Sequence, residues 1–108
     1  MQLFTPEIEQ QLQAQYQLGN CLEKQEIVCK IFNPYGLGTW YLLNQDPEEP
    51  DYLWAIVELY ELEIGSVLKS ELENIRLTGA RLSLERDMHF KSLNAKEAFD
   101  RLRQGEHL

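Results

Sequence analysis

Apolar positions in the middle of the chain follow a strand pattern on both sides of an acidic turn. Residues 39–44 and 52–59 are apolar at most positions and hold both tryptophans of the sequence. Apolar runs of this length are typical of strands covered on both faces, or on one face with aromatic rims. The residues between them include two prolines and four acids, which cannot continue a strand. We therefore predict a central antiparallel hairpin closed by an exposed, mobile loop.

Weaker alternating patterns flank this hairpin. Residues 26–32 and 81–90 alternate between two faces, and each predicts a strand. Residues 64–68 predict a shorter strand, in which Gly65 allows a bend or a bulge. The connections are short turns, so the strands are expected to pair antiparallel.

Three segments predict helices. Thr5, Pro6 and Glu7 are typical of a helix start, and the helix should end near Gly19. Residues 70–75 predict a short middle helix, and Thr78, Gly79 and Ala80 should break it. A C-terminal helix should begin at Asn94, with Glu97 completing a capping box, and end at Gly105.

These elements predict one α+β domain over residues 1–108. We expect a mainly antiparallel sheet of about four to five strands, with the N-terminal, middle and C-terminal helices against one face. The residues expected in the core are Ile31, Trp40, Leu42, Trp54, Ile56, Leu84 and Phe99.

Acidic residues are concentrated in the middle of the chain. The net charge is −8, and residues 46–73 hold nine acids and a single base, Lys69. Such a field repels nucleic-acid phosphates and favours a basic protein partner. The alternative interpretation is a solvated surface that keeps a small protein soluble.

Several classes of function find no support in the composition. No apolar run reaches the roughly 20 residues of a membrane span, so no membrane partner is expected. The N-terminus lacks the pattern of a signal peptide, and two cysteines make no disulfide framework; we expect a cytoplasmic protein. Cys29 should be a small buried hydrophobe. His89 and His107 are the sequence's only histidines, so we predict neither a metal site nor a cofactor.

Residues 85–90, Glu-Arg-Asp-Met-His-Phe, are the most distinctive segment of the chain. As a strand it places Glu85, Asp87 and His89 on one face, at steps of about 7 Å. A carboxylate beside a histidine suits acid–base chemistry, so these three are weak catalytic candidates. The same pattern also fits a surface ladder or a binding surface. Arg86 falls on the apolar face and predicts an ion pair with an acid on the helices.

The candidate binding residues surround the predicted hairpin. They are four acids and two aromatic residues: Asp46, Glu48, Glu49, Asp51, Trp40 and Trp54. The tryptophans could stack on nucleic-acid bases, but the neighbouring acids oppose a polyanion and favour core and rim packing.

Four segments carry a family resemblance: residues 39–41, 63–65, 70–73 and, above all, 85–90. They resemble a family of short bacterial domains of unknown function, often found on plasmids, phages and conjugative elements. The resemblance covers residues 3–93. It departs from the family where a capped helix replaces a Pro-rich tail, and where Leu68 stands at a position usually better suited to capping. It implies no catalytic residues.

Three hypotheses for function follow. The first is a non-enzymatic accessory protein that binds another protein through its acidic surface; one version is mimicry of nucleic-acid charge. The second is a small enzyme with its site at Glu85, Asp87 and His89. The third is a homodimer formed by strand pairing or through the aromatic patch.

Overall fold

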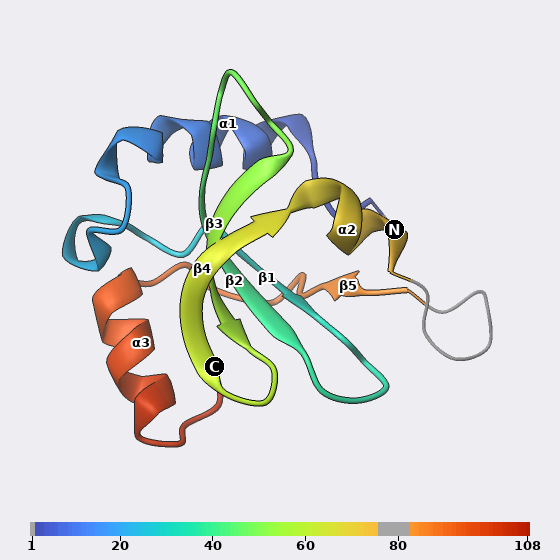
Figure 1. Cartoon of the computed structure of the whole chain (residues 1–108). Coiled ribbons are helices and arrows are strands. Elements are labelled where there is room, and N and C mark those ends of the chain that lie inside the picture. The colour runs from blue at the N-terminus through green and yellow to red at the C-terminus, as the bar shows by residue number, and fades with distance from the viewer. Residues whose placement is uncertain (1, 76–82) are drawn as a thin grey trace.

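The computed structural model describes residues 2–75 and 83–108 (Figure 1). Within them, three α-helices surround one five-stranded sheet, which confirms the predicted α+β fold. In chain order the elements are α1 (Pro6–Ala14), the 3₁₀ turns η1 (Tyr16–Leu18) and η2 (Leu22–Lys24), β1 (Cys29–Phe32), β2 (Thr39–Gln45), β3 (Tyr52–Glu58), β4 (Leu62–Leu68), α2 (Lys69–Asn74), β5 (Glu85–Arg86) and α3 (Ala95–Arg103).

The strands lie in the order β4-β3-β2-β1-β5, and each neighbouring pair is antiparallel. The predicted hairpin of β2 and β3 therefore lies near the centre of the sheet. Its register pairs Leu42 with Ala55 and Asn44 with Trp54, so β2 has one extra residue between these positions. This bulge shifts which side chains of β2 face each side of the sheet.

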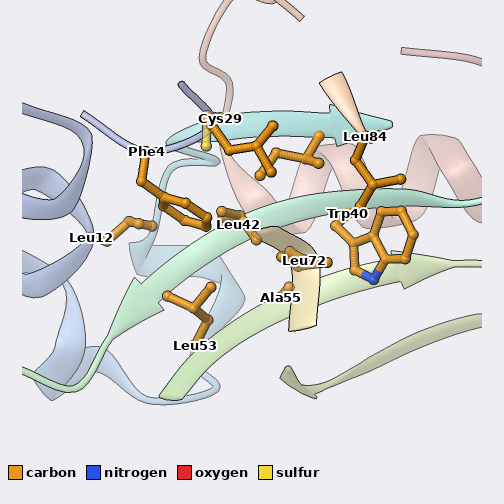
Figure 2. Close-up of a cluster of buried hydrophobic side chains, with 11 residues drawn as sticks. Phe4, Leu12, Cys29, Trp40, Leu42, Leu53, Ala55, Leu72 and Leu84 are labelled. Atoms are coloured by element: carbon orange, nitrogen blue, oxygen red, sulfur yellow. The ribbon is translucent and has the colours of Figure 1, made fainter. Parts of the chain in front are cut away.

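One face of the sheet carries a core closed by α1 and α2. It contains Trp40, Leu42 and Ala55 from the central hairpin, Leu12 from α1 and Leu72 from α2. Figure 2 shows Phe4 and Leu12 at one end of this cluster, and Trp40 and Leu84 at the other. The side chain of Trp40 is 6% exposed. Gly38 beside it has φ +127°, and a Cβ there would lie 2.8 Å from the Trp40 ring, so a larger residue would displace the indole.

The opposite face carries a second core, closed by α3. Tyr41, Leu43 and Ile56 from the hairpin pack there against Ala98 and Leu102 of α3. The prediction that the helices lie against one face is therefore wrong. The physical reason is the sequence of β2 and β3, which is apolar on both faces and needs cover on both.

Most residues predicted to form the core are buried. Ile31, Trp40, Leu42, Ile56 and Leu84 are buried, as predicted. Trp54 and Phe99 are half-buried and pack at the margin of the α3 core. Both therefore lie partly within reach of solvent.

Helix ends follow the predicted caps. The Thr5 hydroxyl accepts a hydrogen bond from Ile8 N at 3.2 Å. The Asn94 side chain accepts from the amides of Lys96 and Glu97. α1 ends at Ala14, earlier than predicted, and η1 continues to Gly19, whose φ is +55°.

Two predicted strands are shorter than expected. The first begins at Cys29, and Glu26 outside it forms an isolated bridge with Asn94. The last is confined to Glu85 and Arg86. Of the predicted strand over 81–90, residues 81 and 82 lie outside the described residues, as does the predicted helix break at 78–80.

Candidate functional site

The loop of residues 46–51, which we call the acidic loop, is held at its first end by Asp46. One carboxylate oxygen of Asp46 accepts hydrogen bonds from the amides of Glu48 at 2.9 Å and Glu49 at 3.3 Å. The other accepts from the Tyr16 hydroxyl at 3.2 Å. The negative charge of Asp46, together with this hydrogen bond, raises the pKa of Tyr16. The loop is thereby joined to η1 as well as to its own turn.

Asp51 holds the second end of the loop by capping α2. Its carboxylate accepts from Ser70 N at 2.8 Å and from the Ser70 hydroxyl at 2.9 Å. Leu68, at the N-cap position of α2, has no side chain that can accept such a bond. An acid from a different part of the chain therefore satisfies the first amides of this helix.

The two glutamates between these anchors face solvent. Glu48 and Glu49 are exposed, as are Pro47 and Pro50. Neither glutamate carboxylate has a hydrogen-bond or ion-pair partner within residues 2–75 and 83–108. The loop thus presents two uncompensated carboxylates on a backbone fixed at both ends.

A cavity of about 600 Å³ opens beside the acidic loop. It lies between η1 and the α3-side face of β3 and β4. Tyr52 is 53% exposed at its rim, and the buried indole Nε1 of Trp54 has no hydrogen-bond partner among the described residues. Its walls are Tyr16, Gln17, Gly19, Asn20, Asn44, Asp46, Tyr52, Leu53, Trp54 and Ser66. Aromatic rings and single polar groups therefore converge next to the exposed acids.

Two buried amide networks shape this end of the molecule, and the sequence reasoning missed both. Asn44 donates to Gly19 O and to the Gln25 side chain, which fixes the η1 wall of the cavity. Gln45 donates to Glu9 and to Pro50 O, which fixes the base of the acidic loop. The strand pattern offered one signal: β2 continues through Asn44 and Gln45, and buried amides need hydrogen-bond partners.

Glu9, on α1, joins the second network as a charged member. Its carboxylate lies 2.8 Å from Lys69 Nζ. Burial favours the neutral acid, but the hydrogen bonds from Lys69 and Gln45 and the charge of Lys69 outweigh it and lower the pKa of Glu9. Lys69, the base within residues 46–73, is thereby already paired.

The nine acids of residues 46–73 lie at two ends of the sheet. The acidic loop and the two glutamates of α2 occupy one end, because β3 starts beside the point where β4 ends. Glu58, Glu61 and Glu63 occupy the other end, at the β3–β4 turn. A strand of this length separates the two groups by about 20 Å.

The two tryptophans proposed for binding do not share a surface. Trp40 is buried in the α1 and α2 core, whereas Trp54 lines the cavity on the opposite face of the sheet. Their positions on β2 and β3 differ in register, and adjacent positions alternate between faces. Only Trp54 lies next to the acidic loop.

The strand face predicted for Glu85, Asp87 and His89 is not formed, because the chain turns after Arg86. Asp87 accepts a hydrogen bond from the backbone amide of His89 at 2.9 Å, and its other oxygen lies 3.7 Å from Lys30 Nζ. The His89 imidazole is exposed at a hollow of about 330 Å³. No described residue donates to or accepts from that ring.

Arg86 anchors the N-terminal segment. Its guanidinium donates to the carbonyls of Gln2 at 2.8 Å and Leu3 at 2.9 Å. The ion pair with an acid on the helices stays a prediction. Cys29 lies in the core closed by α1 and α2. Burial raises the pKa of its thiol to about 12, and the positive charge of Arg86 opposes this increase more weakly. The predicted buried, unreactive role of Cys29 fits this environment.

Other site types find no matching cluster in the described parts of the chain. No group of three or more histidine, cysteine or acidic side chains there could hold a metal ion. Of the helices described, none has the length and apolar character needed to cross a bilayer.

A family model described as "Protein of unknown function (DUF2958)" matches residues 3–103. The chain belongs to this family. The match spans the whole sheet, the cavity and the acidic loop. Neither the curated proteins nor the solved structures contain a match to the chain.

Proposed function

We propose that this DUF2958 protein is a non-enzymatic accessory protein that binds another protein through the acidic loop and the adjoining cavity. The observation that carries the proposal is the contrast within one loop. Asp46 and Asp51 accept hydrogen bonds that fix the backbone, while Glu48 and Glu49 face solvent without partners. A recognition surface fixed before binding loses less conformational entropy when its partner docks.

The cavity beside the loop supports a protein partner. Tyr16 and Tyr52 are exposed and Trp54 is half-buried, and aromatic residues of this kind dominate the energetics of protein interfaces. The acids at the rim would attract a basic surface and orient it before contact. A nucleic acid would meet repulsion at the same place.

A role on a mobile element, with mimicry of nucleic-acid charge, is a narrower form of the proposal that the positions of the acids favour less. Mimicry of a nucleic-acid backbone requires carboxylates in a long continuous row. The acids of residues 46–73 instead form two groups about 20 Å apart. This separation favours a compact basic partner at the acidic loop over a protein that normally grips a nucleic-acid backbone.

Affinity capture from a lysate of the source organism tests the proposal. The immobilised wild-type protein is compared with a Glu48→Gln, Glu49→Gln double variant, which keeps both loop anchors. A Glu23→Gln, Glu97→Gln double variant serves as the matched control for loss of two exposed acids outside the loop. We expect at least one protein to be recovered with the wild type and the control but lost with the loop double variant. Identical recovery from all three would overturn the proposal.

A further inference from the structure

β4 (Leu62–Leu68) forms one edge of the sheet. Its seven residues contain no proline and no lysine, the residues with which natural proteins block edge strands, and Glu63 is its one charged residue. The opposite edge is β5, which has two residues. An open edge of seven residues offers a row of backbone groups with which another strand can pair.

The hydrogen bonds at the end of β4 show which of its residues face outward. Lys69 N donates to Asp51 O at 2.8 Å, so this pair belongs to the hydrogen-bonded set of the β3–β4 ladder. Bonded residues alternate along an antiparallel strand. The bonded set therefore consists of Lys69, Val67, Gly65 and Glu63. The residues between them, Ile64 and Ser66, direct their N–H and C=O groups away from β3. No hydrogen bond from another described element reaches these groups.

Hollows lie on both sides of this edge. Ser66 and Trp54 line the cavity beside the acidic loop. On the other face, a hollow of about 490 Å³ has Gly65 and Val67 among its described lining residues. A Cβ built on Gly65 would meet nothing within 4 Å, so space is open directly over the strand. Since side chains of a strand alternate between faces, a strand added here would place them over both hollows in turn.

The charge around the edge favours a basic occupant. Asp46 borders the first hollow, and Glu63 and Glu71 border the second. Lys69, at the end of the strand, is already paired with Glu9 at 2.8 Å. A second copy of this chain would bring its own net charge of −8 to the same place. Like charges disfavour that association and favour a positively charged segment.

We propose that β4 accepts an extended, basic segment of a partner protein as an additional strand. The inference rests on the proposed function, because it names the kind of segment that docks beside the acidic loop and how it docks. The backbone groups of Ile64 and Ser66 supply hydrogen bonds that depend little on sequence. The two hollows receive side chains from the two faces of the added strand, and the acids at their rims favour basic residues among them.

Titration of the ¹⁵N-labelled full chain with a defined peptide tests the proposal. The probe is a capped octapeptide of alternating lysine and valine, and the matched control replaces each lysine by glutamate. We expect the lysine peptide to protect the amides of Ile64 and Ser66 from hydrogen exchange, and the glutamate peptide to leave them unchanged. Ser66→Pro removes an outward N–H but no bond to β3, and should weaken binding at least about tenfold.

Each outcome has a defined consequence. Thermal unfolding of Ser66→Pro checks that the variant folds, and the wild-type exchange data test the proposal without it. Absence of binding at millimolar peptide, protection confined to the acidic loop, or equal binding by Ser66→Pro would overturn the proposal. So would a dimer, seen by light scattering, that Ser66→Pro abolishes. If the loop double variant loses its captured protein while Ser66→Pro retains it, the proposed function stands and strand addition fails.

Discussion

In both the acidic loop and the turn that follows β5, an aspartate accepts hydrogen bonds from backbone amides a few residues further along the chain. Asp46 does so in the loop and Asp87 in the turn. The loop then leaves Glu48 and Glu49 in solvent beside an aromatic cavity. At the β5 end two charged side chains are instead bound within the molecule: Asp87 lies near Lys30, and Arg86 donates to the N-terminal backbone.

This difference separates two uses of charge that look alike in the sequence. At the β5 end, ionised groups fasten distant segments to the sheet: Arg86 donates to the N-terminal carbonyls, and Lys30 donates to the backbone oxygen of Leu108. At the loop end, the same local turn chemistry leaves the carboxylates of the loop's two glutamates facing solvent. The density of distinctive residues pointed to residues 85–90, whereas the exposed carboxylates beside the aromatic cavity belong to the acidic loop.

The largest expected effect concerns the thiol of Cys29, on the strand β1 that pairs with β5. With a pKa raised by burial to about 12, the Cys29 thiol is ionised in about one molecule in 10,000 at pH 8. A thiol-reactive dye should therefore label half-exposed Cys21 and leave Cys29 unlabelled until the protein unfolds. Mass spectrometry after timed labelling at pH 8 measures both sites. Equal labelling rates would mean that this end of the core is open.

Removal of the N-terminal anchor should have the next largest effect. Arg86→Ala breaks charged hydrogen bonds to the carbonyls of Gln2 and Leu3, and should lower the free energy of unfolding by about 1.5–3 kcal/mol. The Glu48→Gln, Glu49→Gln double variant is the control and should change it by about 0.5 kcal/mol or less. Urea unfolding measures both. Equal losses would erase the distinction between anchoring and displayed charge.

The smallest expected effect concerns the α2 cap. Asp51→Ala should lower the free energy of unfolding by about 0.5–2 kcal/mol, because Ser70 N loses its acceptor. Asp51→Asn keeps an acceptor oxygen and should lose less than the alanine variant. Urea unfolding of the pair separates the hydrogen bond from the charge. Unchanged stability in Asp51→Ala would place Asp51 with the displayed acids and weaken its role as a loop anchor.

The sequence predicted best those features that depend on a few consecutive residues. The hydroxyl of Thr5 and the amide of Asn94 cap their helices as expected, because a cap needs only a few consecutive residues. The double-sided apolar pattern of β2 and β3 also predicted the central hairpin. The same pattern also indicated that helices cover both faces of the sheet, as the core closed by α1 and α2 and the core closed by α3 require; the prediction of a single covered face did not follow it.

The site was less predictable, since it depends on contacts between distant residues. Asp51 serves α2 only because β3 and β4 pair, which brings it to Ser70. Trp40 and Trp54 look equivalent in the sequence, yet the register places one in a core and the other beside the cavity. The carboxylates of Asp46 and Asp51, which the sequence places in the predicted binding charge, also accept the hydrogen bonds that hold the loop, and the sequence did not predict those bonds.

The sequence by itself determined the helix caps, the central hairpin and the concentration of acid between residues 46 and 73, because each is a property of neighbouring residues. The tertiary structure alone decided which acids are partnered, which tryptophan is accessible and which strand is left at an edge. Those outcomes follow from strand order and register, and residues that pairing brings together can be far apart along the chain.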